Sequence, residues 1–311
     1  AFALPTYQSA WLKTHYPAAF LAGVLTHDPG MYPKRLIVDE VRQMGIAIAP
    51  LDVNASDSVY RVEDHGNAIR IALSTVAGIS DGEVQSIIAA RPYIDLNDFV
   101  RRSGSSTPVT ESMILTGAFD SLHIDVNRRD LLLHFSDLQK SPSAAVSGAQ
   151  MNLGFDPPAL VSSGLPAMSA AESVKYEVDR LGIDMSRHMI EFYGDFLNAI
   201  GAVRSSDLLK QRSQSSVLVA GIKVAMQTPP VRSGKRVIFV TLDDGYGLSD
   251  STFFTDVQGE YANVLYSTSL LLVRGITRRT GARGISIRAT GAWDLRAAYE
   301  SWSTKQSTLA I

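Results

Sequence analysis

The hydrophobic pattern of this chain changes period near residue 205, and that change is the strongest constraint on its fold. Before it, apolar residues recur at helical spacing; after it, residues 205–296 hold five short β-like runs separated by turns of Gly, Pro and Asp. The runs are 217–222, 237–242, 251–254, 270–273 and 285–288, with a helical stretch at 261–265 before the fourth. This arrangement predicts a small five-stranded Greek-key barrel, the OB-fold, within a multidomain α+β protein.

A glycine-containing turn at 76–79 leads directly into a helix with a strong start signal. Ser80 is expected to accept from the N–H groups of the first helical turn, and Glu83 to accept in return from the Ser80 N–H, which is a capping box. The turn aims N–H groups and the positive end of the helix dipole outward, an arrangement that suits a phosphate oxygen. We therefore predict that Gly78, Ser80 and Gly82 bind DNA backbone; the alternative is that the turn only joins two helices.

A second helix start follows, with Thr107 predicted as the N-cap and Pro108 as the first helical residue. That helix is expected to end at Gly117, so two helical pairs share the same glycine punctuation. We predict a tandem helix-hairpin-helix unit over residues 69–139, which would grip nucleic-acid backbone without reading sequence.

The remaining segments flank these two modules. Residues 1–68 show helical patterns and then a β-hairpin around His65-Gly66-Asn67. Residues 140–204 are expected to form a linker rich in Ser, Ala, Pro and Gly, followed by connecting helices. The barrel is assigned to residues 205–296, and residues 297–311 follow it as a C-terminal tail.

The predicted barrel carries a group of basic side chains with no acid among the arginines between positions 274 and 288. The predicted DNA contacts on the barrel are Lys235, Arg236, Arg274, Arg278, Arg279 and Arg283. Beside Phe239, Phe253 and Phe254, such a basic surface suits a single-stranded backbone with stacked bases. The alternative is that the phenylalanines fill the barrel core and the arginines form a solvated hairpin.

No catalytic site is recognisable in the sequence. The six histidines show no metal-ligand spacing, and neither a P-loop nor a Gly-x-Ser-x-Gly turn is present, so no catalytic residue, metal or cofactor is assigned to this chain. Asp243-Asp244 is interpreted as a turn before Gly245.

Apolar residues make up 45% of the chain, no apolar run approaches the roughly 20 residues of a membrane span, and no membrane partner is expected. The absence of cysteine excludes disulfides and fits a cytoplasmic location.

Several segments occur in the same order as in a known family. They are residues 2–13, 16–20, 51–54, 73–78, 117–122 and 181–188. In this order they resemble the bacterial family C DNA polymerases, the alpha-subunit type of DNA polymerase III, over nearly the whole chain. The Gly and Pro usual around His188 are replaced by Arg187 and Met189.

The resemblance implies the C-terminal portion of a template-directed DNA polymerase. Residues 1–68 would be the end of the fingers region, followed by the tandem hairpins and the OB domain. The palm aspartates and their Mg²⁺ ions would lie upstream of Ala1, so this portion is not expected to polymerise DNA alone. Its expected partner is DNA, both the primer–template duplex and the single-stranded template.

The resemblance also bears on the linker. Gln150, Met151, Leu153 and Phe155 resemble the short peptide by which bacterial polymerases dock on the sliding clamp; alternatively they pack on a neighbouring domain. A chain that stops soon after the barrel favours the accessory, error-prone branch, although a truncated replicative chain would look the same. The other class of function left open is a non-enzymatic nucleic-acid-binding or protein-docking scaffold built from the same modules.

Overall fold

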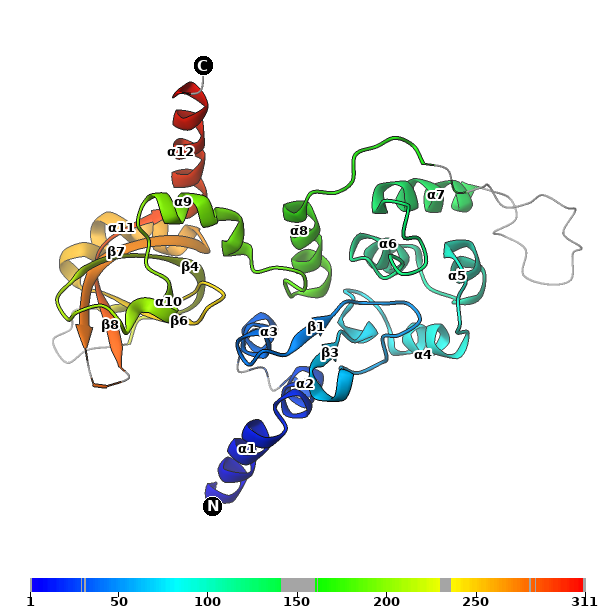
Figure 1. Cartoon of the computed structure of the whole chain (residues 1–311), viewed down its shortest axis with the longest axis horizontal. Coiled ribbons are helices and arrows are strands. Elements are labelled where there is room, and N and C mark those ends of the chain that lie inside the picture. The colour runs from blue at the N-terminus through cyan, green and yellow to red at the C-terminus, as the bar shows by residue number, and fades with distance from the viewer. Residues whose placement is uncertain are drawn as a thin grey trace, which may run out of the picture. The chain divides into compact units, whose positions relative to one another are not determined.

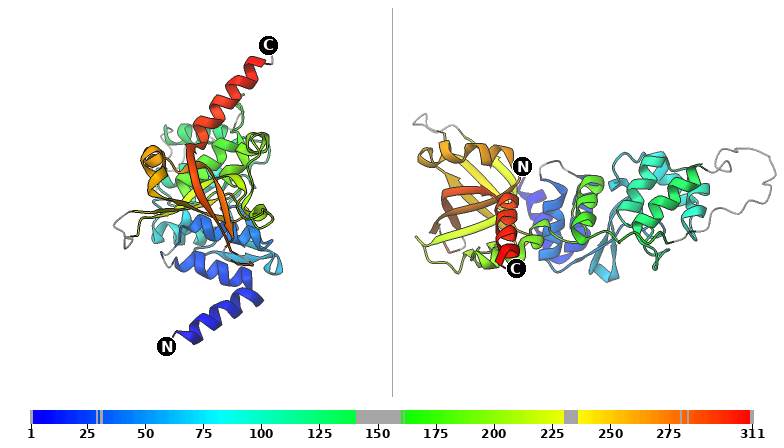
Figure 2. Two further views of the ribbon diagram at one scale, coloured as in Figure 1. Left: turned by 90° about the vertical axis from the view of Figure 1, so that its left-hand side faces the viewer. Right: turned by 90° about the horizontal axis from the view of Figure 1, so that it is seen from above.

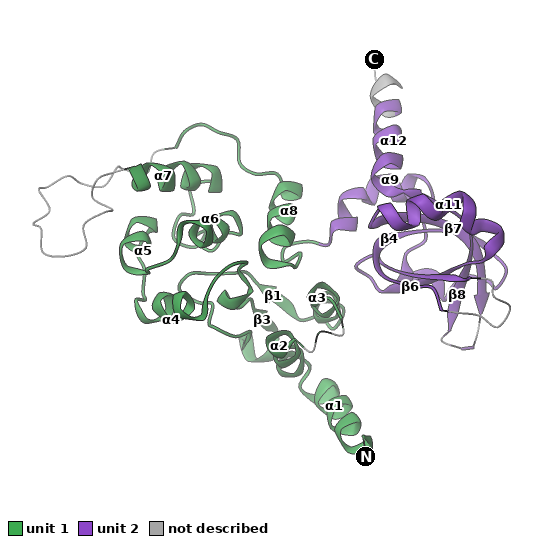
Figure 3. Ribbon diagram, turned by 180° about the vertical axis from the view of Figure 1, so that it is seen from behind, with its two compact units in different colours: residues 1–187 green, residues 188–311 purple. Residues whose placement is uncertain are grey.

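The computed structural model describes residues 2–28, 30, 32–140, 160, 162–229, 236–279, 281–282 and 284–309. These residues form two compact units, 1–187 and 188–311 (Figures 1 and 3). The division falls inside the segment 140–204 that the sequence analysis assigned to a linker and connecting helices.

Unit 1 is a helical assembly around a small sheet. Its helices are α1 (Ala3–His15), α2 (Pro17–His27), α3 (Lys34–Gln43), α4 (Asp81–Ala89), α5 (Leu96–Arg102), α6 (Thr107–Leu115), α7 (Arg128–Lys140) and α8 (Ala170–Leu181), with 3₁₀ turns η1 (Asp64–Gly66) and η2 (Leu73–Thr75). Its strands are β1 (Ala47–Ala49), β2 (Arg61–Glu63) and β3 (Ala68–Arg70), in the order β1-β3-β2. The antiparallel pairing of β2 with β3 confirms the hairpin predicted around His65.

The core of unit 1 is continuous from the sheet to the hairpin helices. Ile69 on β3 and Leu73 on η2 are fully buried in the same apolar cluster as Phe99 and Phe119. The Phe99 ring makes edge-to-face contacts with the rings of Tyr93 and Phe119, with centroids 5.0 and 4.9 Å away. Such packing keeps the α4–α6 segment rigid behind its exposed turns.

Unit 2 is a closed barrel with flanking helices (Figures 1 and 2). Its strands are β4 (Ser216–Gln227), β5 (Ile238–Asp243), β6 (Leu248–Phe253), β7 (Leu270–Arg279) and β8 (Ile285–Asp294). Its helices are η4 (Met189–Tyr193), α9 (Gly194–Ala199), α10 (Ser205–Leu208), α11 (Thr255–Ser267) and α12 (Leu295–Leu309), so residues 297–309 of the predicted tail are helical.

The strand order of the barrel, β4-β5-β6-β8-β7, confirms the predicted OB-fold. β6 and β8 run parallel, the other pairs are antiparallel, and α11 connects the third strand to the fourth. Each of the five predicted runs overlaps one of these strands, with residues 237 and 254 just outside β5 and β6, and the helical stretch at 261–265 lies in α11. Asp243 ends β5, and its side chain accepts from the Gly245 N–H at 2.9 Å, which confirms the predicted turn.

Two sequence interpretations need correction. The N-cap of α6 is Ser106, not Thr107, because Thr107 is already helical and Pro108 needs no N–H partner in the first turn. Of the three phenylalanines considered for the barrel core, only Phe253 is buried, at 0% exposure. Phe239 and Phe254 are 43% and 39% exposed.

Candidate nucleic-acid interface

The first hairpin joins the short turn η2 to α4, and its start has the predicted capping box. The Ser80 Oγ accepts from the Glu83 N–H at 3.3 Å, and the Glu83 carboxylate accepts from the Ser80 N–H at 2.9 Å. Gly78 has φ +80°, and among the described residues no atom lies within 4 Å of where its Cβ would stand. The N–H groups of Asp81 and Gly82 belong to the first turn, which provides them no acceptor, and both residues are exposed.

The second hairpin repeats this arrangement between α5 and α6. Gly104, with φ +66°, stands two residues before the N-cap Ser106, as Gly78 stands two residues before Ser80. The second helix was predicted from the sequence, but the roles of Gly104 and Ser106 were not. The repeated spacing of a glycine two residues before an N-cap serine is the signal that would have identified them.

One carboxylate lies between the two hairpins. While one oxygen of Glu83 accepts from Ser80, the other accepts from the Ser106 N–H at 3.0 Å and from the Ser106 Oγ at 2.7 Å. The bonds from Ser106, followed by those from Ser80, lower the pKa of Glu83 to about 2. Glu83 therefore brings the N-termini of α4 and α6 together on one surface of unit 1; each of these helices is 9 residues long.

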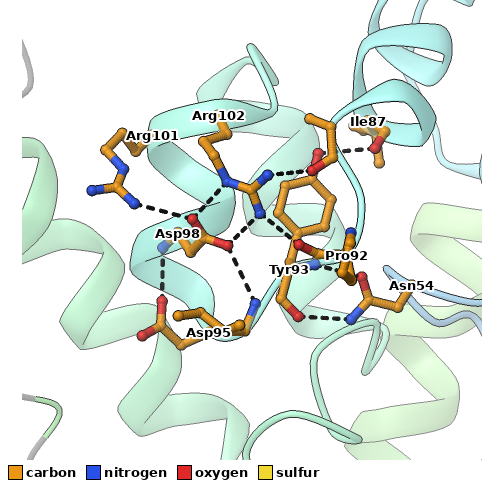
Figure 4. Close-up of polar contacts among 10 residues, drawn as sticks. Asn54, Ile87, Pro92, Tyr93, Asp95, Asp98, Arg101 and Arg102 are labelled. Atoms are coloured by element: carbon orange, nitrogen blue, oxygen red, sulfur yellow. Dashed lines mark hydrogen bonds and ion pairs between the residues drawn. The ribbon is translucent and has the colours of Figure 1, made fainter.

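Behind the hairpins, Arg102 joins α5 to the end of α4 (Figure 4). Its guanidinium donates to Asp98 and to two backbone carbonyls of the segment 90–92, and it lies 4.9 Å from the centroid of the Tyr93 ring. Chiefly because of Arg102, the pKa of Asp98 falls to about 2. Arg101 also donates to Asp98, at 3.1 Å, but its side chain is 76% exposed and its charge faces solvent.

A groove lies on the outside of the barrel where β6, β8 and β7 are adjacent. Register places Thr252 beside Arg288, and Arg288 beside Ile276. The groove has a volume of about 590 Å³. It is lined by Gln214, Thr252, Phe254, Thr255, Asp256, Ile276, Thr277, Arg278, Ser286 and Arg288.

Cations and an aromatic ring meet in this groove. The Arg288 guanidinium lies 5.5 Å from the centroid of the Phe254 ring and 3.1 Å from the Asp256 carboxylate. Arg278 is exposed on the next strand and lines the same groove. A partly exposed ring in a groove lined by guanidinium groups can stack a base while the cations pair with phosphate.

The other predicted basic residues are distributed more widely. Arg274 lies 5.4 Å from the centroid of the Trp293 ring, on the outside of β7. Arg279 donates to the carbonyl oxygens of Leu209 and Gln211, so part of its donor capacity is used within unit 2. Arg236 is exposed.

Some predicted contacts lie outside the described residues. They are Lys235 and Arg283 on the barrel and the predicted clamp peptide, Gln150, Met151, Leu153 and Phe155. On the barrel, Phe254 was considered for base stacking from the sequence, but Arg288 was not predicted as a contact. The pairing of Thr252 with Arg288 across β6 and β8 brings Arg288 close to Phe254, two residues beyond Thr252.

Comparison with known proteins agrees with this fold. A family model described as a helix-hairpin-helix motif matches residues 45–131. Together with the closed OB barrel, this defines a protein built from two modules that commonly bind nucleic acid.

Curated relatives are more specific. The error-prone DNA polymerase of Symbiobacterium thermophilum is 30% identical over an alignment 334 positions long, which covers 92% of this chain and 31% of that protein. The DNA polymerase III subunit alpha of Vibrio cholerae is 29% identical over 321 residues, covering 97% of this chain and 27% of the relative. The chain therefore belongs to the family of bacterial DNA polymerase III alpha subunits and error-prone DNA polymerases. It spans less than a third of the length of these relatives.

Solved structures share parts of the chain at low scores. The yeast mitochondrial single-stranded DNA binding protein Rim1 is 13% identical, with a TM-score of 0.23, over 27% of this chain and 97% of its own. Within the described part of the chain, none of the helices has the length and apolar character needed to cross a membrane.

Proposed function

We propose that this chain is the DNA-holding, C-terminal portion of a template-directed bacterial DNA polymerase. The observation that carries the proposal is similarity to such polymerases over more than nine tenths of the chain. Nucleotidyl transfer, with its Mg²⁺ ions, would belong to a palm outside this chain, and the portion alone would be inactive. Its cellular place would be the cytoplasm, in replication or in error-prone synthesis past damage, since relatives of both kinds match at 29 to 31% identity.

The two modules would hold different parts of the DNA. The paired hairpins present first-turn N–H groups and the positive ends of two helix dipoles, a chemistry suited to duplex phosphates. The barrel groove would take the single-stranded template, with a base against Phe254 and phosphates beside Arg278 and Arg288. Both contacts involve phosphates and the faces of bases, which every nucleotide has, so neither contact would depend on the DNA sequence.

The test is binding of the 311-residue chain to a fluorescent primer–template and to single-stranded DNA across a salt series. We expect log affinity for single strands to fall with log salt at about −0.7 per phosphate contacted. The double variant Arg278→Ala/Arg288→Ala should flatten that slope. Lys210→Ala, which removes an exposed cation outside the groove, is the matched control and should leave the slope unchanged.

Either of two results would count against the proposal. Absence of binding to both DNAs at low salt would favour the protein-docking scaffold. Equal losses of single-strand affinity in the groove variant and the Lys210 control would show that the groove does not bind single strands. The hairpins would then be the remaining candidate for DNA binding.

The sliding clamp is a further proposed partner, through Gln150, Met151, Leu153 and Phe155. An amide and apolar anchors at this spacing suit insertion into an apolar groove. Gln150→Ala/Phe155→Ala should abolish binding of the chain to purified bacterial sliding clamp and leave DNA binding intact. Unchanged clamp binding, measured by surface plasmon resonance, would rule this peptide out.

A further inference from the structure

The carboxylate of Glu83 has more hydrogen-bond donors than a capping box requires. One oxygen accepts from the N–H and Oγ of Ser80, at 2.9 and 2.8 Å. The other accepts from the N–H and Oγ of Ser106, at 3.0 and 2.7 Å, 23 residues further along the chain. Both serines are N-caps, so a single side chain ties the start of α4 to the start of α6.

A second capping box in the same chain shows what the motif does by itself. Ser169 and Glu172 make both reciprocal bonds at the start of α8. The other oxygen of Glu172 accepts from Arg129 at 2.8 Å, not from a second helix start. The link between two helix starts is therefore a property of position 83, and Glu172 provides a matched comparison.

The link leaves other N–H groups at both helix starts without intrahelical acceptors. In α4 these belong to Asp81 and Gly82, and in α6 to Thr107, followed by Pro108, which has no N–H. Glu83 thus occupies the N-cap donors of the two hairpins without using these first-turn donors.

We infer that Glu83 is a positioning residue that holds the two hairpins at a fixed separation, so that both engage one stretch of duplex backbone together. The inference rests on the proposed function, because it assumes that the hairpins bind duplex DNA. Two contacts held at a matched spacing act as one bivalent contact, and loosening the spacing lowers the effective concentration of the second.

Glu83→Gln tests this link, because the loss of charge and the loss of positioning change the affinity for duplex DNA in opposite directions. Glutamine places an NH2 group where one carboxylate oxygen stood, so the backbone N–H on that side, of Ser80 or of Ser106, loses its acceptor. Removing a negative charge from a DNA-facing surface would by itself strengthen DNA binding. Loss of positioning predicts the opposite, a duplex affinity about fivefold weaker, because the second hairpin no longer binds in register.

The experiment compares the wild-type 311-residue chain with Glu83→Gln and Glu172→Gln for binding to a fluorescent duplex at fixed salt. Amide exchange of Ser106 is measured in the same three proteins. We expect weaker binding and faster Ser106 exchange in Glu83→Gln only. Ser106→Ala, which keeps the carboxylate and removes one donor, should show a smaller loss in the same direction and covers the case in which Glu83→Gln fails to fold.

The outcomes separate the inference from the proposed function. A wild-type chain that does not bind duplex overturns the proposed function and the inference with it. A wild-type chain that binds duplex, with Glu83→Gln binding as tightly or more tightly, overturns the inference alone. Equal weakening in Glu83→Gln and Glu172→Gln would assign the effect to helix capping and also overturn it.

Discussion

Asp98 offers the sharpest test of how the hairpin region is stabilised (Figure 4). Its side chain is 8% exposed and accepts from Arg102 Nε at 2.6 Å, from Arg101 at 3.1 Å and from the Ile94 N–H at 3.3 Å. Asp98→Asn keeps the shape of the side chain and removes its charge. We expect the free energy of unfolding of unit 1 to fall, because Arg102 and the Ile94 N–H lose their charged, buried acceptor.

The magnitude follows from the pKa of Asp98, which Arg102 chiefly lowers from 3.8 to about 2. Each pKa unit is about 1.4 kcal/mol, so the interactions of the charged form contribute about 2 kcal/mol, after allowance for screening at the 34% exposed Arg102. The pKa in the folded state lies below that in the unfolded state. The contribution is therefore complete above about pH 4 and is lost as pH falls through about 2.

Urea unfolding followed by circular dichroism, with amide exchange in α5, measures this loss for wild type and Asp98→Asn. Asp137→Asn is the control, because its pair with Lys140 is exposed and should change stability by less than about 0.5 kcal/mol. A variant within about 0.5 kcal/mol of wild type at pH 7 would refute the reasoning. So would a difference of about 2 kcal/mol that persists below the folded pKa of Asp98.

Three further predictions concern single residues. Gly117→Ala should destabilise unit 1 by about 2 kcal/mol in urea, because φ is +86° and the new Cβ would meet the Arg128 guanidinium; a neutral result would contradict this. Burial lowers the pKa of His123, so stability should fall as pH drops below about 6.5. His123→Gln should therefore reduce the change in the thermal unfolding midpoint between pH 8 and 5; equal pH profiles for the two proteins would count against this. Phe254→Ala should weaken single-strand binding by about 1–3 kcal/mol in fluorescence titrations, whereas Phe239→Ala, also exposed but outside the groove, should have little effect; the reverse order would move the site to β5.

The local elements were predictable because their causes lie within a few residues. A serine and a glutamate three positions apart specify the capping box at α4 wherever that helix packs. The period-2 runs specify five strands, and their number and spacing with one helix leave few topologies other than the barrel. The second hairpin followed the same logic, and the one-residue error at Thr107 arose because serine and threonine are both good N-caps.

The candidate sites depended on contacts between residues far apart in the chain. Sequence by itself determined that Glu83 caps its own helix, and that the barrel carries arginines and phenylalanines. Only the tertiary structure decided that the second oxygen of Glu83 meets Ser106, because packing of α4 and α6 sets that distance. Only strand closure decided that Phe254 is exposed beside Arg288, since a linear pattern records how residues alternate but not which strand becomes the neighbour.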